Sequence, residues 1–240
     1  MIIKNNLLNY KNAYIYQDTE YFKMSIDSLL LAKFVTINMR DKKILDLATG
    51  NAPIPMLLTY RTKAHIYGVE LQTPVYNLGI ISVSENNMKK QITLINDDIN
   101  NLFNVFESDT FDVITCNPPY FKTKNVLFEN NNKIKSSARH ENKMNLEDVF
   151  RVSKYLLKNE GRLALVHRSE RLVEILAMMK KYNFEPKKIR FVYPNRKKDS
   201  DLILIECTLN GKSGIKVMNP LYIYEKRNVY SKEVEDMFGE

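Results

Sequence analysis

Short apolar runs alternate with helix-like segments along most of this 240-residue chain. Runs such as KILDL, YGVEL and LALVH suit buried strands, and the segments between them carry apolar residues at helical spacing. Regular alternation of strands and helices is typical of a parallel sheet with covering helices. The pattern therefore predicts an α/β fold. The length and the 44% content of hydrophobic residues suffice for one well-buried core.

Seven strands and several helices can be placed from this alternation. The expected strands lie at residues 42–47, 65–71, 91–95, 111–116, 161–167, 187–193 and 201–209. The expected helices begin at about Pro53 and cover residues 73–87, 146–157 and 168–182, and a further helix over 25–35 is expected to be capped by Ser25. We expect a single domain over residues 1–240, with a lead-in at 1–40, a core at 41–210 and a C-terminal extension at 211–240.

Composition narrows the classes of function. No apolar run approaches the roughly 18 residues that a membrane span needs, and the start has no secretory pattern, so we expect a cytoplasmic protein. Cys116 and Cys207 lie in separate apolar runs without metal-ligand spacing and only three histidines occur, so we expect buried free thiols and no zinc site. The net charge of +8 favours a polyanionic partner.

The stretch FDVITCNPPYF, residues 111–121, joins an expected strand directly to two prolines. Proline fixes φ and lacks a backbone donor, so Pro118 and Pro119 predict a rigid extended loop with unpaired carbonyls at the end of that strand. In open α/β sheets this edge is where ligands bind.

The first strand leads into DLATGNAP, which has the character of a nucleotide-type cofactor loop. Dinucleotide and S-adenosylmethionine sites both place an acidic residue and small residues at this turn, because a larger side chain blocks the ligand. Asp46, Ala48, Gly50 and Asn51 are therefore candidate cofactor-binding residues. Alanine stands at positions 48 and 52, where glycine is expected, and a positive φ at alanine costs about 1 kcal/mol or more.

Two further strand ends carry acidic residues. Glu70 ends the second strand, where a carboxylate can accept hydrogen bonds from both ribose hydroxyls, and Leu71 follows it. After the third strand, Asp98 can bind the amino group of an adenine while Ile99 packs on the ring. Two alternatives stay open here: Asp97 can take that role, or Asp98 caps the following helix.

The order of these features along the chain resembles that of the class I S-adenosylmethionine-dependent methyltransferases that modify planar amides or exocyclic amines. The features are the loop that begins at Asp46, then Glu70, Asp98 and Asn117-Pro118-Pro119-Tyr120. The resemblance implies a Rossmann-like class I methyltransferase fold. Its sheet is expected to be seven-stranded and mostly parallel, with helices on both faces. The implied cofactor is S-adenosylmethionine, and Asn117 would lie beside it.

The tetrapeptide suits chemistry on an aromatic amine, whose lone pair is delocalised into the ring. The Asn117 side-chain oxygen and the Pro118 carbonyl can accept the two N–H bonds and so localise the lone pair. The target base must be flipped out of the nucleic acid, and the Tyr120 ring can then stack on it. Asn117, Pro118, Pro119 and Tyr120 are the candidate catalytic residues.

Over nearly its whole length the chain is most similar to the bacterial tRNA (adenine-N6) methyltransferases that act on position 37 of a valine tRNA. The similarity includes the lead-in pattern at Phe22, Asp27 and Leu30 to Ala32, the stretches ILDLATGNAPIPMLL and CNPPYF, and the ARHE segment that ends at Glu141. It implies tRNA, through its anticodon arm, as the partner, with no membrane and no metal. Candidate substrate-binding residues are Lys122, Lys124, Arg139 and His140, and a second basic cluster lies at 196–198.

Two other functions remain possible at this point. Enzymes that methylate a glutamine of release factors also act on a planar NH2 group, but they carry a helical domain before the cofactor loop, and only 45 residues precede Asp46. A non-catalytic RNA-binding module would explain the two alanines of the loop, although the intact tetrapeptide argues against it.

Overall fold

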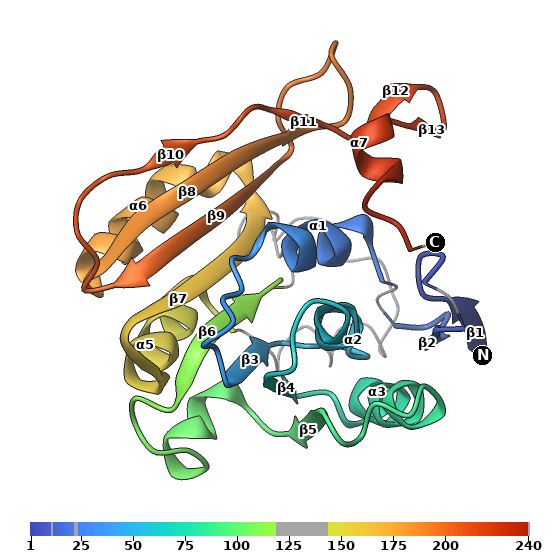
Figure 1. Cartoon of the computed structure of the whole chain (residues 1–240), viewed down its shortest axis with the longest axis horizontal. Helices are drawn as coiled ribbons and strands as arrows, with labels where there is room; N and C mark the ends of the chain where they lie inside the picture. The colour runs from blue at the N-terminus through green and yellow to red at the C-terminus, as the bar shows by residue number, and fades with distance from the viewer. Residues whose placement is uncertain (11, 22–23, 119–143, 240) are drawn as a thin grey trace, which may run out of the picture.

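The computed structural model describes residues 1–10, 12–21, 24–118 and 144–239, and its largest element is a nine-stranded sheet (Figure 1). The strand order is β10-β8-β9-β7-β6-β3-β4-β5, and β11 also pairs with β8. The seven long strands are β3 (Lys43–Leu47), β4 (His65–Glu70), β5 (Ile92–Asn96), β6 (Phe111–Cys116), β7 (Leu157–Arg168), β8 (Phe184–Tyr193) and β9 (Leu202–Leu209). Each overlaps a strand predicted from the sequence. The short β10 (Lys216–Val217) and β11 (Leu221–Tyr222) were not predicted.

The long strands are parallel except for β9, which runs antiparallel to β7 and β8. The connection from β8 to β9 covers only residues 194–201, which is too short for the crossover that a parallel pair needs. The predicted Rossmann-like, mostly parallel sheet is therefore confirmed, with two short strands added at the β8 edge.

Helices cover both faces of the sheet, as predicted. One face carries α1 (Ile26–Phe34), α2 (Pro53–Thr59) and α3 (Thr73–Glu85), and the other carries α5 (Leu146–Leu156), α6 (Leu172–Lys181) and the 3-10 helix η1 (Ile99–Asn104). A further 3-10 turn, η2 (Ser169–Arg171), precedes α6.

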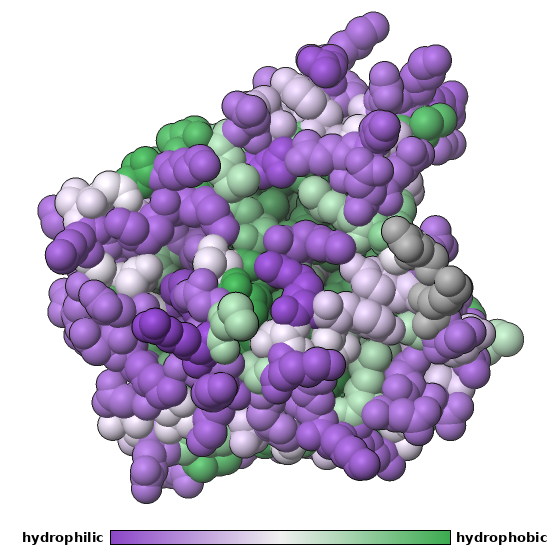
Figure 2. Space-filling model, viewed as in Figure 1, coloured by the Kyte–Doolittle hydropathy of each residue, from purple (hydrophilic) through white to green (hydrophobic). Residues whose placement is uncertain are grey.

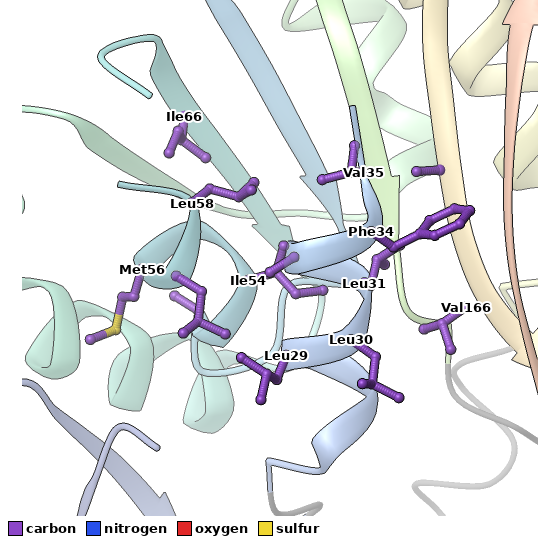
Figure 3. Packing of buried hydrophobic residues seen from close by; sticks show 14 of the residues in the cluster. Leu29, Leu30, Leu31, Phe34, Val35, Ile54, Met56, Leu58, Ile66 and Val166 are labelled. Carbon is purple, nitrogen blue, oxygen red and sulfur yellow. The ribbon is translucent and has the colours of Figure 1, made fainter. Parts of the chain in front are cut away.

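The hydrophobic core is split by the sheet into two clusters. Val113 of β6 packs with α1 and α2 whereas its neighbour Ile114 packs with α5 and α6, as expected when successive side chains of a strand point to opposite faces. Figure 3 shows the first cluster, in which Leu29, Leu30 and Leu31 of α1 lie among residues of α2 and the sheet. Cys116 and Cys207 are buried free thiols.

The helix predicted over residues 25–35 is present as α1, but its predicted cap is wrong. Ser25 occupies the N-cap position, yet its side chain makes no capping hydrogen bond, and its buried Oγ has no partner. The backbone explains this, because the Ser28 N–H donates to the Ser25 carbonyl oxygen, 3.3 Å away, in place of the hydroxyl.

The lead-in also contains an antiparallel hairpin that the sequence did not reveal. It consists of β1 (Ile2–Asn6) and β2 (Tyr14–Asp18). The strand β2 runs along α3, where the backbone N–H groups of Tyr14 and Tyr16 each donate to a side-chain oxygen at 2.9 Å, Asn86 Oδ1 and Ser82 Oγ respectively.

The chain after β9 runs back to the N-terminal residues. It passes through β12 (Tyr224–Lys226), β13 (Val229–Tyr230) and α7 (Lys232–Glu235). The Gly239 N–H then donates to the Leu8 carbonyl oxygen at 3.0 Å, so the two termini lie side by side (Figure 1). This arrangement suits a single domain over residues 1–240, which stays a prediction.

The face seen in Figure 2 is mostly hydrophilic, with apolar side chains in separate patches. Within the described ranges, none of the helices combines the length and the apolar character that a membrane crossing requires.

Candidate functional site

The predicted site residues gather at the carboxyl edge of the sheet. The strands β6, β3, β4 and β5 are neighbours and parallel, so their following loops meet at one edge. Asp46 of β3 is in register with Thr115 of β6 and Gly68 of β4, and Glu70 of β4 is in register with Asn96 of β5. The described part of the site is thus built by four adjacent strands.

The loop after β3 has an unusual backbone. Ala48, Gly50 and Ala52 have φ values of 53°, 60° and 70°, all in the left-handed region. The positions at which glycine was expected therefore do require a positive φ, and each alanine bears a strain of about 1 kcal/mol. A Cβ atom added at Gly50 would meet nothing within 4 Å, so there is open space over the centre of this turn.

Asp46 supports the loop from inside the protein. Its side chain is fully buried, and its two oxygens accept hydrogen bonds from the hydroxyls of Thr49 and Thr115, both at 2.6 Å. Burial raises the pKa of Asp46, the two hydrogen bonds lower it and the charge of Glu70 adds a smaller increase, which together bring the pKa to about 7. A carboxylate in this environment holds β3, β6 and the loop in register.

Glu70 links the second strand end to the same loop. Its Oε2 accepts from the Gly50 N–H and its Oε1 from the Gln72 N–H, both at 2.9 Å. The side chain is 6% exposed, and burial raises its pKa. Each carboxylate oxygen has two acceptor sites, so these bonds leave capacity for a ligand hydroxyl. The neighbouring Leu71 is 38% exposed at the same edge.

The structure places Asp98 in the capping role that the sequence left open. Its Oδ1 accepts from the Asn100 N–H at 2.8 Å and caps η1. Ile99 is 5% exposed and packs in the core cluster with Leu102. Contact of Asp98 and Ile99 with an adenine ring stays a prediction.

Asn51 ties the loop to the N-terminal hairpin. Its Nδ2 donates to the Tyr16 carbonyl oxygen at 2.7 Å, and the side chain is almost fully buried. The amide thus fixes the position of β2 beside the loop, a structural role that the sequence did not suggest.

Asn117 and Pro118 follow β6 directly, as predicted. The Asn117 Nδ2 donates to the Ser28 hydroxyl of α1 at 3.3 Å, which brings a helix of the lead-in to the candidate catalytic residue. Pro118 is buried. The remaining candidates lie outside the described residues: Pro119, Tyr120, Lys122, Lys124, Arg139 and His140, together with Phe22 and Glu141 of the family pattern.

Residues 38–201 match the model of a family described as a methyltransferase domain, which is well over half of the chain. The chain belongs to this methyltransferase family.

Curated relatives of this methyltransferase are named tRNA1(Val) (adenine(37)-N6)-methyltransferases. The protein of Flavobacterium johnsoniae is 23% identical over 235 residues, which cover 98% of each chain. That of Tolumonas auensis is 26% identical over 226 residues, which cover 93% of this chain and 91% of the relative.

Solved structures share the fold of this methyltransferase. A predicted O-methyltransferase from Agrobacterium tumefaciens superimposes with a TM-score of 0.70 at 19% identity and covers 88% of this chain and 94% of its own. A geranyl diphosphate methyltransferase in complex with SAM has a TM-score of 0.56 at 13% identity, covering 76% of this chain and 84% of its own. At these identities the likeness shows the fold alone.

Three side chains of the methyltransferase site were missed at the sequence level: Thr49, Thr115 and Ser28. The signal that could have indicated Ser28 is its position, a polar residue in the apolar run DSLLLA. Among the described residues, no group of three or more His, Cys, Asp or Glu side chains is arranged to hold a metal ion.

Proposed function

We propose that this methyltransferase transfers a methyl group from S-adenosylmethionine to the N6 amine of an adenine in tRNA. The observation that carries the proposal is the position of Asn117 and Pro118, directly after β6 at the edge that also holds the loop of residues 48–52 and Glu70. The names of the curated relatives support the same substrate.

The described residues fit this cofactor. The open space at Gly50 allows a ligand to approach the backbone, and the Glu70 oxygens retain acceptor sites for ribose hydroxyls. We propose that Asp98 binds the adenine of the cofactor, because its second carboxylate oxygen can accept a hydrogen bond from the adenine amino group. S-adenosylmethionine, when bound, supplies an electrophilic methyl group on a sulfonium.

The residues after β6 orient the amine that receives the methyl group. The Asn117 Oδ1 and the Pro118 carbonyl oxygen accept its two N–H bonds, which directs the nitrogen lone pair away from the ring. Tyr120 stacks on the flipped base. The methylated amine is strongly acidic and releases its proton to water, so no general base is required.

Within tRNA, we propose adenine 37 of a valine tRNA as the target, following the relatives' names. Basic residues that follow the tetrapeptide in the chain are proposed to contact the anticodon arm. They are Lys122, Lys124, Arg139 and His140. Lysine and arginine side chains there would bind phosphates and position the RNA.

Replacement of Asn117 by alanine tests the mechanism. The variant loses the acceptor for the amine while the cofactor loop, built on other strands, is retained. We expect cofactor affinity close to wild type and single-turnover methyl transfer to unmodified valine tRNA slowed by about a hundredfold to a thousandfold. The matched control is Asn104→Ala, which removes an exposed asparagine of η1 and is expected to leave transfer unchanged.

Substrate class is tested in the same assay. Wild-type protein is given labelled cofactor with either unmodified tRNA or a release factor, and the labelled product is identified. Methylation of a release-factor glutamine instead of adenine would replace the proposed function. RNA binding without transfer to either substrate would leave a non-catalytic module.

A further inference from the structure

Ser28 carries a buried hydroxyl on the face of α1 that contacts Asn117, at the carboxyl edge of the sheet. It is 4% exposed and precedes three consecutive leucines that pack in the core. A buried hydroxyl without a hydrogen-bond partner destabilises a fold, so a polar residue at such a position calls for a partner. Here that partner is the Asn117 amide, 89 positions later in the chain.

In this contact the nitrogen end of the Asn117 amide faces the hydroxyl. Ser28 Oγ accepts from Asn117 Nδ2, so the oxygen end of the same planar group points to a different side. An amide that rotated by half a turn would present N–H donors where a substrate amine needs an acceptor. In the observed contact the hydrogen bond to Ser28 holds the amide in the orientation in which Oδ1 can accept from that amine.

The helix that carries Ser28 is firmly held at its other end. Lys188 Nζ donates to the Phe34 carbonyl oxygen at 2.7 Å, and the Arg61 guanidinium donates to the carbonyl oxygens of Ala32 and Val35. Together with the packing in Figure 3, these bonds place Ser28 on a rigid element, which precise orientation of a reacting group requires.

We infer that Ser28 is a positioning residue for methyl transfer, acting through the orientation of Asn117. The inference rests on the proposed function, because the orientation matters only if Asn117 accepts from a substrate N–H. It extends the active site into the lead-in of the chain, since α1 thereby becomes part of the catalytic machinery.

The first test is Ser28→Ala with saturating cofactor and unmodified valine tRNA. We expect single-turnover transfer to fall roughly tenfold, the usual effect of losing one hydrogen bond, with cofactor affinity unchanged. The matched control is Ser153→Ala on α5, which also removes a buried helix hydroxyl, one that has no partner and lies on the opposite face of the sheet. The control is expected to transfer at the wild-type rate.

A double-variant cycle separates positioning from general damage to the fold. If Ser28 acts only through Asn117, Ser28→Ala slows the wild type but has no effect on the residual rate of the Asn117→Ala variant. An equal slowing in both backgrounds would overturn the inference, as would a Ser28→Ala variant that transfers at the wild-type rate.

A readout without RNA keeps the inference separate from the proposed function. The side-chain amide of Asn117, observed by NMR, is expected to gain mobility in Ser28→Ala and not in Ser153→Ala. An amide unchanged by Ser28→Ala would overturn the positioning role even in an active enzyme. Increased mobility in a protein that does not methylate adenine would refute the proposed function and leave the contact standing.

Discussion

At the level of single residues, Asp46 combines complete burial with a pKa raised to about 7 from an ordinary value of 3.8. The folded protein therefore holds this proton more tightly than the unfolded chain does. The resulting stabilisation is fully present below about pH 4 and is lost as pH rises through 7. Ionisation of Asp46 therefore costs stability at neutral pH.

We predict that Asp46→Asn, which cannot ionise, raises the free energy of unfolding relative to wild type more at pH 8 than at pH 5. The gain at pH 8 is expected to be of the order of 1–3 kcal/mol. Denaturant unfolding of both proteins at the two pH values measures it. Because His167, whose pKa is lowered to about 4 mainly by burial, is present in both proteins, its opposite pH dependence cancels in the difference.

A stability difference that does not change between pH 5 and pH 8 would show that Asp46 is ionised across this range. Calorimetry with S-adenosylmethionine accompanies the experiment. We expect weaker binding by Asp46→Asn, because the loop loses the carboxylate that accepts from both threonine hydroxyls.

At the level of elements, the turn between β3 and α2 stores backbone strain at its two alanines. Ala48 is partly exposed, so Ala48→Gly removes the left-handed strain at little cost in packing and is expected to stabilise the fold by about 0.5–1 kcal/mol. Ala52 is fully buried in the core, so Ala52→Gly also loses a buried methyl group and is expected to change stability by less.

Denaturant unfolding checks both values, with Ala177→Gly as the matched control. Ala177 is an exposed residue of α6, where the same substitution is expected to cost about 1 kcal/mol. If Ala48→Gly were as destabilising as this control, the backbone at residue 48 would not have the left-handed conformation described above.

At the level of the whole molecule, the net charge of +8 should govern association with RNA. We predict that tRNA affinity falls steeply between about 50 and 200 mM salt, because phosphate neutralisation releases counterions. Charge reversal at Lys122 and Lys124 is expected to reduce the slope of log affinity against log salt by roughly one for each phosphate that is no longer neutralised. Filter binding at several salt concentrations measures the slope.

The control for this experiment reverses the same number of charges elsewhere. Lys89 and Lys90 are exposed and lie just before Gln91 and β5, at the amino end of that strand, so Lys89→Glu with Lys90→Glu is expected to leave the slope nearly unchanged. An equal effect of the two double variants would mean that only total charge matters. Binding that does not depend on salt would exclude phosphate contact.

The sequence by itself determined the elements and their class. The seven long strands follow from short apolar runs, because a strand covered on both faces of the sheet is apolar along its length. The helices α1, α3, α5 and α6 follow from apolar residues at helical spacing, because one face of each is buried. Glu70 and Asn117 could be assigned to one edge of the sheet because each follows or ends a strand, and the carboxyl ends of parallel strands lie at the same edge. The positive φ at Ala48 and Ala52 was also anticipated from the expected glycines.

Only the tertiary structure decided which side chains meet across elements. The Asp46 carboxylate finds Thr115 at a separation of 69 positions, Asn51 finds Tyr16 at 35, and Asn117 finds Ser28 at 89. These pairs depend on how helices and strands dock on one another, and docking is set by the packing of two complementary surfaces. Periodicity along one segment carries no information about its partner, so contacts of this kind appear only when the whole core is assembled.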